Sequence, residues 1–277
     1  MEEMHSSIRR NTGDLIRAIA KSWLARSLMA AALTSGSLQL VLSAEDHKSN
    51  NAHHWTYSGQ QGPEHWAELD PQFAACKKGK WESPIDIQQA TTSDLPPLVF
   101  NYSGAPLNIV DNGHTVMVTY APGSTLTVGK NKYELKQFHF HHPSEERIDG
   151  KQFDMVVHLV NQDSEGHLAV VAILLKQGRE NPLIAQLRGK VPAEKEHPVT
   201  LPDVLINAKE ILPSHLGYYT FPGSLTTPPC TEGVTWYVVK APMEISAEQL
   251  DWFAKLYPSD ARPIQPLHGR TILQTRN

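Results

Sequence analysis

The chain has 277 residues, of which 40% are hydrophobic and 19% charged, and its formal net charge is −4. This composition is typical of a globular protein, and so weak a negative charge gives no reason to expect a nucleic acid or an acidic lipid as a partner. Because no linker rich in proline, glycine or serine interrupts the chain after residue 60, we expect one domain over residues 55–277.

The first 44 residues differ in character from the rest. Several basic side chains precede two short apolar stretches, and the second stretch ends at Ala44. This order is typical of a secretory signal peptide, whereas a membrane anchor needs a longer uninterrupted apolar run. We therefore expect residues 1–44 to be a signal peptide and the protein to be exported, either periplasmic or secreted, without stable membrane insertion after cleavage. A retained anchor is the alternative, and the polar residues 45–54 are typical of a flexible segment.

Short runs rich in β-branched and aromatic residues, separated by turn residues, predict strands in the middle of the chain. In chain order they cover residues 107–110, 115–120, 126–128, 137–141, 155–160, 168–175 and 234–239. Helical patterns are fewer and cover residues 181–188, 204–212 and 246–256. The last one begins at Ser246, with Gln249 three residues later, which is a capping-box pattern. The sequence thus predicts a mainly β fold with peripheral helices.

Two of the expected strands carry three histidines. His139 and His141 are separated by one residue, so their side chains share one face of a strand, whereas Phe140 points to the other face. The turn-rich residues 143–150 allow the chain to return antiparallel and to bring His158 beside this pair. Three imidazoles on a rigid sheet leave the fourth position of a tetrahedral zinc ion open, as in catalytic zinc sites. The alternative is three ordinary histidines, since a His-x-His pair alone is a weak signal.

The chain has two cysteines, Cys76 and Cys230. In an exported protein, such a pair predicts a disulfide bond, and the alternative is two unrelated buried thiols. Closing so long a loop would stabilise the folded protein by about 4–5 kcal/mol in the chain-entropy model, which is an upper expectation.

A set of motifs in a fixed order resembles the α-class carbonic anhydrases in their bacterial exported form. The most specific are Gln-Phe-His-Phe-His at 137–141, His-Leu-Val at 158–160 and the segment 224–236, and further matches lie at 55–57, 62–66, 83–87, 112–114 and 262–267. The resemblance implies a single domain around a large, mostly antiparallel twisted β-sheet. It also implies reversible hydration of CO2 to bicarbonate and a proton, with Zn2+ held by His139, His141 and His158.

This reaction needs hydroxide at neutral pH, and zinc supplies it by lowering the pKa of bound water to about 7, an effect for which carbonic anhydrase is itself the known example. By resemblance, Thr226 accepts a hydrogen bond from the zinc-bound hydroxide and donates its own to Glu145. The adjacent Glu146 is expected to be a solvated loop acid. Thr227 would line the polar side of the pocket. The family's apolar CO2-binding wall corresponds to Val160, Val170, Leu225, Val234 and Trp236.

By the same resemblance, His114 is the proton shuttle, Asn112 organises the water beside it, and Tyr57 belongs to the same proton network. A histidine with a pKa near ~6.5 suits proton transfer at neutral pH. On the sequence alone, His114 is an ordinary turn histidine in Asn-Gly-His.

One position departs from the family pattern. Histidines that bind zinc normally donate their second ring N–H to an acceptor. Gln137 matches the family's acceptor for His139, but Val156 stands where the family has a glutamate for the third ligand. Asp154 lies four strand residues from His158, about 13 Å away, and cannot substitute. We therefore expect His158 to use water, a backbone carbonyl or another side chain, and zinc to be held less tightly than usual.

Two other functions stay open from the sequence. In a metal-dependent cupin, Glu145 would join His139 and His141 as a metal ligand, but that family expects a glycine where Tyr133 stands. A non-enzymatic binding domain of the carbonic anhydrase type usually lacks a zinc histidine, and all three are here. The sequence also leaves a homodimer open.

Overall fold

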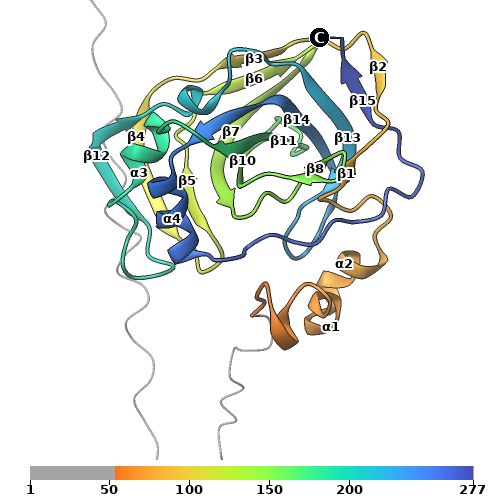
Figure 1. Cartoon of the computed structure of the whole chain (residues 1–277), viewed down its shortest axis with the longest axis horizontal. Coiled ribbons are helices and arrows are strands. Elements are labelled where there is room, and N and C mark those ends of the chain that lie inside the picture. Colours follow the sequence, from red (N-terminus) through yellow and green to blue (C-terminus); the bar gives the residue numbers. More distant parts are fainter. Residues whose placement is uncertain (1–53, 277) are drawn as a thin grey trace, which may run out of the picture. The chain divides into compact units, whose positions relative to one another are not determined.

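The computed structural model describes residues 54–276, which Figure 1 shows in colour. The predicted signal peptide and nearly all of the predicted flexible segment lie outside the described residues. Between residues 54 and 276, no helix combines the length and the apolar character that crossing a membrane requires.

A mixed, twisted sheet of 12 strands dominates the described residues (Figure 1). Its main path runs in the order β12-β4-β5-β7-β10-β11-β14-β13-β15-β2, and β6 pairs with both β3 and β7. Neighbours run antiparallel except β11 with β14 and β15 with β2. The prediction of a large, mostly antiparallel sheet is confirmed. The strands are β2 (Thr91–Ser93), β3 (Leu98–Asn101), β4 (Ala105–Asp111), β5 (Val116–Thr119), β6 (Thr125–Val128), β7 (Asn131–His141), β10 (Met155–Gln162), β11 (Leu168–Gln177), β12 (Val199–Ile206), β13 (Tyr218–Ser224), β14 (Glu232–Ile245) and β15 (Leu273–Thr275).

A second, three-stranded sheet consists of β1 (Asp86–Ile87), β8 (Arg147–Ile148) and β9 (Lys151–Gln152). β8 pairs with β1 in parallel and with β9 in an antiparallel hairpin. The amide of Arg147 also donates to the carbonyl of Ile85 at 3.3 Å. This small sheet therefore anchors the connection between β7 and β10.

Side-chain alternation divides the central strands β7 and β10 between two apolar clusters. The larger cluster receives every second residue, namely Phe138, Phe140, Met155, Val157 and Leu159. Val156 belongs instead to a smaller cluster that includes Trp236. Because the three histidines alternate with the first set, they lie on the face of the smaller cluster.

The helices of the described residues are short. Within residues 54–276 they are α1 (Trp66–Leu69), α2 (Ala75–Lys78), α3 (Pro182–Leu187) and α4 (Ala247–Leu256), with the 3-10 helices η2 (Gly59–Gln61), η3 (Pro71–Ala74) and η4 (Ala208–Ile211). The capping box predicted at Ser246 is confirmed. The Ser246 hydroxyl accepts from the amide of Gln249, and the Gln249 side chain accepts from the amide of Ser246.

The helix predicted over residues 204–212 is wrong in its first half. Residues up to Ile206 belong to β12, which pairs with β4, and only η4 is helical. Leu205 in this strand is 64% exposed. Backbone pairing with a neighbouring strand thus outweighs a weak helical period in this segment.

Cys76 in α2 and Cys230 form a disulfide bond, as the sequence predicts. The bond ties α2 to the segment between β13 and β14. Within that segment the amide of Leu225 donates to Thr231 O at 3.0 Å, and the amide of Cys230 donates to Thr227 O at 2.8 Å. One covalent link and two hydrogen bonds therefore hold the short loop that carries Thr226.

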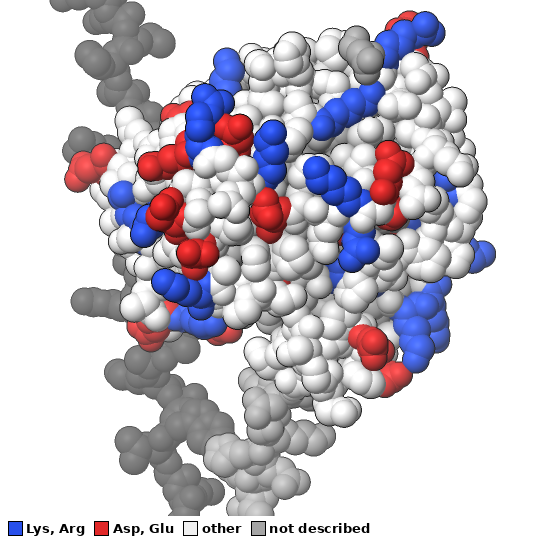
Figure 2. Space-filling view, in the orientation of Figure 1, with Lys and Arg blue, Asp and Glu red and all other residues white. Residues whose placement is uncertain are grey.

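Acidic and basic side chains are mixed over the surface in view. Figure 2 shows Lys and Arg interspersed with Asp and Glu, with wide uncharged areas between them. That face offers no extended basic surface, in keeping with the formal net charge of −4.

Candidate metal centre and active site

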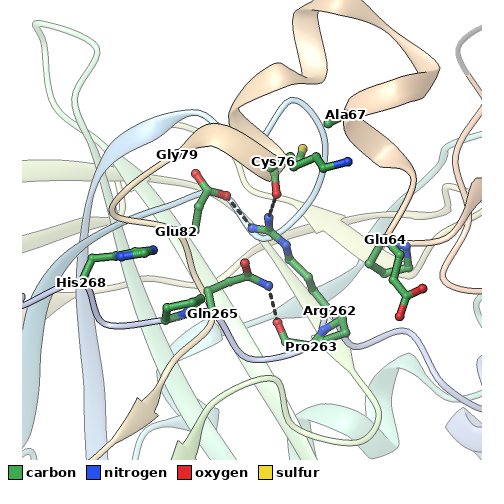
Figure 3. Close-up of a pocket in the computed structure, with 12 residues that line it drawn as sticks. Glu64, Ala67, Cys76, Gly79, Glu82, Arg262, Pro263, Gln265 and His268 are labelled. Atoms are coloured by element: carbon green, nitrogen blue, oxygen red, sulfur yellow. Dashed lines mark hydrogen bonds and ion pairs between the residues drawn. The ribbon is translucent and has the colours of Figure 1, made fainter.

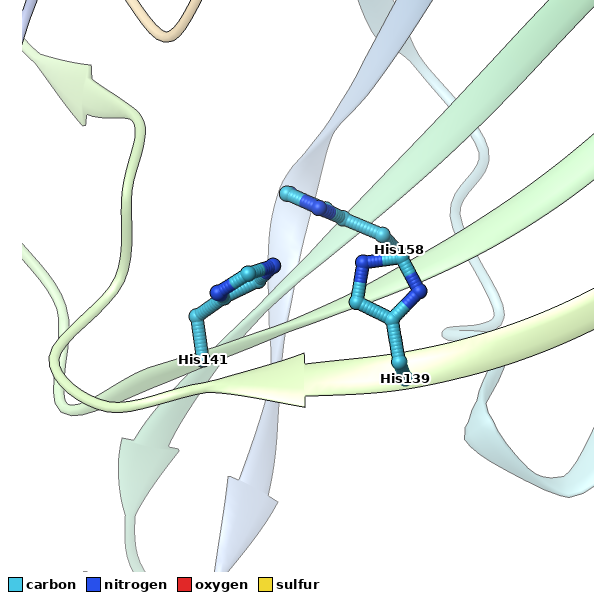
Figure 4. Close-up of side chains that lie close together, drawn as sticks. All are labelled: His139, His141 and His158. Carbon is cyan, nitrogen blue, oxygen red and sulfur yellow. The ribbon is translucent and has the colours of Figure 1, made fainter. Parts of the chain in front are cut away.

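Three histidines from two neighbouring strands converge on one point. β7 and β10 pair antiparallel with His139 opposite His158, and His141 follows on the same face of β7. One ring nitrogen of each lies within 4.8 Å of those of the other two. Figure 4 shows the three rings turned toward one another. The prediction that these side chains come together is confirmed.

The second nitrogen of each ring contacts an acceptor. His139 Nδ1 lies 2.8 Å from Gln137 Oε1, and His141 Nδ1 lies 2.7 Å from the carbonyl oxygen of Asp260. His158 Nε2 lies 3.0 Å from Glu146 Oε1. Because these acceptors require an N–H, the proton of each ring is on the outer side, and the inner nitrogens of all three rings keep a free lone pair.

Burial disfavours the charged form of two of these rings. It lowers the pKa of His139 and of His158 well below the ordinary value, and the neighbouring imidazoles add to the effect. The inner nitrogen of His141 is buried and has no hydrogen-bond partner among the described residues. Neutral imidazoles with inward lone pairs are the form in which histidine binds a metal.

The environment of Glu146 differs from the one that the sequence predicts. This side chain was expected in solvent, but its relative exposure is 0% and both carboxylate oxygens face His158 Nε2, at 3.0 and 3.3 Å. Burial raises the pKa of Glu146 to about 7. Val156, which replaces the expected glutamate, is buried in the apolar cluster. Water, a backbone carbonyl and another side chain are the partners expected for His158. The structure shows another side chain, that of Glu146.

Glu145 reaches the cluster from the same loop. Its Oε1 accepts from the backbone amide of Arg262 at 2.8 Å, and its Oε2 lies 3.5 Å from His141 Nε2. Burial and the adjacent Glu146 raise the pKa of Glu145 well above its ordinary value, whereas the Arg262 amide and the Thr226 hydroxyl act to lower it. Glu145 Oε2 is buried and has no hydrogen-bond partner among the described residues. Thr226 itself is 6% exposed.

Arg262 connects this carboxylate to a cavity outside the histidine cluster. Its buried guanidinium donates to Glu82 Oε2 at 2.7 Å, to Ser83 O at 2.7 Å and to Cys76 O at 2.9 Å. Figure 3 shows the guanidinium bound to Glu82 and Cys76 at the edge of a cavity of about 360 Å³. None of the three histidines lines this cavity, so it is separate from the histidine cluster.

The side chains expected to form an apolar wall lie together. Val170, Val234 and Trp236 are buried in the smaller cluster, and Val160 and Leu225 pack against it while staying partly exposed. The Trp236 ring meets the His158 ring edge-on, with ring centroids 4.9 Å apart. An apolar surface thus adjoins the histidines, and Thr227 is half-buried in the loop beside it.

The three residues expected in proton transfer have distinct environments. The half-buried His114 ring stacks on Trp55 at 3.6 Å, and burial lowers the pKa of His114 to about 4, with a further contribution from His54. Asn112 Oδ1 accepts from the amides of His114 and Thr115, so it shapes the turn. The Tyr57 hydroxyl is buried without a hydrogen-bond partner among residues 54–276, and burial raises the pKa of Tyr57 well above its ordinary value.

Sequence reasoning missed Asp260 as well as Glu146. The Asp260 carbonyl oxygen binds His141, its Oδ1 accepts from the amide of His142 at 2.6 Å, and burial raises its pKa to about 7. Asp260 lies two residues before the motif 262–267, but 119 residues separate it from His141. No local signal predicts a contact over that separation.

Comparison with known proteins agrees with this geometry. The family model described as eukaryotic-type carbonic anhydrase matches residues 61–276. A carbonic anhydrase of Nostoc sp. is 43% identical over 79% of this chain and 85% of the relative, and one of Pectobacterium atrosepticum is 41% identical over 86% and 98%. The solved structure of a hyperthermostable carbonic anhydrase from a hydrothermal vent chimney has a TM-score of 0.78 and 43% identity, covering 80% of this chain and all of that one. The chain therefore belongs to the α, or eukaryotic-type, carbonic anhydrase family.

Proposed function

We propose that the protein catalyses the reversible hydration of CO2 to bicarbonate and a proton at a zinc ion held by His139, His141 and His158. The observation that carries the proposal is the convergence of their three inner nitrogens within 4.8 Å. Family membership and the carbonic anhydrases among its relatives support the same reaction.

The donor set fits zinc. Zinc prefers four tetrahedral ligands, and catalytic sites use three from the protein. Here the three donors are neutral imidazoles, each held by an acceptor on its outer nitrogen. The buried inner nitrogen of His141, which lacks a partner among the described residues, is the kind of atom that a metal ion would satisfy.

When bound, zinc lowers the pKa of water and so supplies the nucleophile at neutral pH. The chain's own residues orient that nucleophile. The backbone amide of Arg262 donates to Oε1 of Glu145, which leaves Oε2 to accept a hydrogen bond from the Thr226 hydroxyl. The Thr226 oxygen can then only accept a hydrogen bond, and this fixes the direction in which the nucleophile presents its lone pair.

Substrate and product need different surfaces. The apolar side chains of Val160, Val170, Leu225, Val234 and Trp236 suit CO2, which has no charge and no hydrogen-bond donor. Leu225 precedes Thr226 in the chain and Thr227 follows it. The polar side chain of Thr227 suits bicarbonate. The product proton leaves toward His114, along a path that includes Asn112 and Tyr57.

The test is stopped-flow CO2 hydration by the oxidised, zinc-loaded protein. We expect fast hydration that a chelator abolishes and that added zinc restores. Stoichiometric zinc binding without hydration would contradict the proposal and would favour a binding role instead.

We also propose that the chain is exported and that residues 1–44 are removed. The disulfide bond supports this, because such bonds persist in oxidising compartments. N-terminal sequencing of the protein from a periplasmic or culture fraction should begin near residue 45. Recovery of the uncleaved chain from membranes would point to a retained anchor.

A further inference from the structure

The third histidine of the metal centre is held by a residue that the family pattern does not use. His158 and Val156 lie two residues apart on β10, so their side chains share a face. The Val156 side chain cannot accept a hydrogen bond. The sequence pattern therefore leaves His158 without a partner on its own strand.

Glu146, on the loop between β7 and β10, is the hydrogen-bond acceptor for His158. Its two carboxylate oxygens lie 3.0 and 3.3 Å from His158 Nε2, and the two side chains are 0% and 1% exposed. A carboxylate buried this deeply needs a partner, and its side-chain hydrogen-bond partner among the described residues is His158. The contact therefore fixes the ring and directs its Nδ1 toward the other two histidines.

The loop that carries Glu146 is bound on both sides of it. Ser144 Oγ donates to the Glu146 carbonyl at 2.9 Å and accepts from the amide of Phe153 at 2.9 Å. Arg147, the next residue, begins β8 and pairs with β1. The backbone at Glu146 is thus fixed, as a residue that orients a metal ligand requires.

The two adjacent glutamates approach different nitrogens of His158, because Glu145 Oε2 lies 3.9 Å from Nδ1 and Glu146 Oε1 lies 3.0 Å from Nε2. Glu145 Oε1 accepts from the amide of Arg262, whereas both oxygens of Glu146 face His158. We infer that Glu146 is a positioning residue that orients His158 and strengthens metal binding, in place of the strand glutamate that Val156 has replaced. The inference rests on the proposed zinc centre, and it reverses the expectation that zinc is held loosely.

Zinc release to excess dipicolinate, measured on the full-length protein, tests this role. Glu146→Met removes the acceptor at similar volume, and zinc should leave about 10–100-fold faster or bind that much more weakly. Glu146→Gln keeps an acceptor without the charge and should be intermediate. Glu180→Gln, which neutralises an exposed carboxylate, is the control and should behave as the unaltered protein.

A rescue separates orientation of His158 from a merely structural role. Val156→Glu combined with Glu146→Met should restore slow zinc release, whereas Val156→Glu alone should give no gain, since His158 Nε2 already has its partner. The cobalt-substituted protein should show a changed visible spectrum in Glu146→Met and a restored one in the double variant. The thermal midpoint of each apo-protein reports whether folding has changed.

Two results would overturn the inference. One is a folded Glu146→Met protein that releases zinc as slowly as the unaltered chain. The other is a gain of about tenfold or more in zinc affinity from Val156→Glu alone, which would mean that His158 lacked a partner. These measurements need no turnover, so absent CO2 hydration with normal zinc release would count against the proposed reaction and not against Glu146.

Discussion

Arg262 fixes Glu145 through its backbone amide, which donates to Oε1 at 2.8 Å, while its own guanidinium forms a buried ion pair with Glu82. The position of the Glu145 carboxylate therefore depends on the ion pair between the Arg262 guanidinium and Glu82. A change at that ion pair should affect stability and turnover together.

Arg262→Met should destabilise the protein strongly, because it leaves the buried Glu82 carboxylate without its cation. Breaking a buried pair in this way typically costs about 3–5 kcal/mol, as measured by urea denaturation. Adding Glu82→Gln should recover part of the loss. The exposed pair of Arg179 with Glu244 is the matched control, and Arg179→Met should change the free energy of unfolding by less than about 1 kcal/mol.

Thr226→Ala should lower CO2 hydration by about 100-fold, because the nucleophile loses the acceptor that orients it. Thr226→Ser keeps the hydroxyl and should retain most of the activity. Zinc content should be the same in both variants, since Thr226 is not among the three residues whose nitrogens converge. Equal turnover of the alanine and serine variants would remove Thr226 from the mechanism.

His114→Ala should lower turnover in weak buffer, and imidazole-type buffers should restore it. The stack on Trp55 adds a second expectation, because a ring with a pKa of about 4 accepts protons poorly at neutral pH. Trp55→Ala exposes the ring and should raise its pKa toward ~6.5, as measured by NMR titration, and should speed proton transfer. If His114→Ala leaves turnover in weak buffer unchanged, the product proton takes another route.

The lowered pKa of His114 should make the free energy of unfolding depend on pH. The pKa of His114 is about 4 in the folded protein, below the ordinary value near ~6.5, so the unfolded chain binds more protons between these values. The free energy of unfolding should therefore fall as the pH is lowered from ~6.5 toward 4, and this share of the fall should be absent in His114→Gln. Urea denaturation of both proteins across this range measures the difference. Parallel curves for the two would exclude a contribution from His114.

Removing the disulfide should affect the loop that carries Thr226 as well as the stability of the folded protein. Cys76→Ala with Cys230→Ala should lower the free energy of unfolding by about 2–5 kcal/mol. Because the bond restrains the loop that carries Thr226, CO2 hydration should also fall while zinc content stays constant. Unchanged activity at reduced stability would show that the two loop hydrogen bonds suffice to place Thr226.

Strand alternation made much of the fold and the histidine centre predictable. Phe138 and Phe140 mark one face of β7, so the face of His139 and His141 follows from the sequence, and an antiparallel return places His158 beside them. The helix expected at 204–212 failed because β12 gains its hydrogen bonds from β4, which is far away in sequence.

The unpredicted features share a physical cause, which is that they depend on contacts between distant segments. Two consecutive glutamates after a turn look solvated, and nothing local shows that Glu146 is fully buried against a histidine 12 residues later. The stack of Trp55 on His114 and the carbonyl of Asp260 on His141 join segments separated by dozens of residues. Only the folded chain brings these pairs together.

Two parts of the fold contribute to the histidine cluster, namely the large sheet and the small three-stranded sheet. The large sheet carries the three histidines, because all three lie on β7 and β10. The acceptor for His158 arrives with the loop, and the loop is anchored where β8 meets β1 across two residues on each strand. The inferred role of Glu146 therefore predicts that changes in this peripheral hairpin alter metal retention, without altering either strand that carries the histidines.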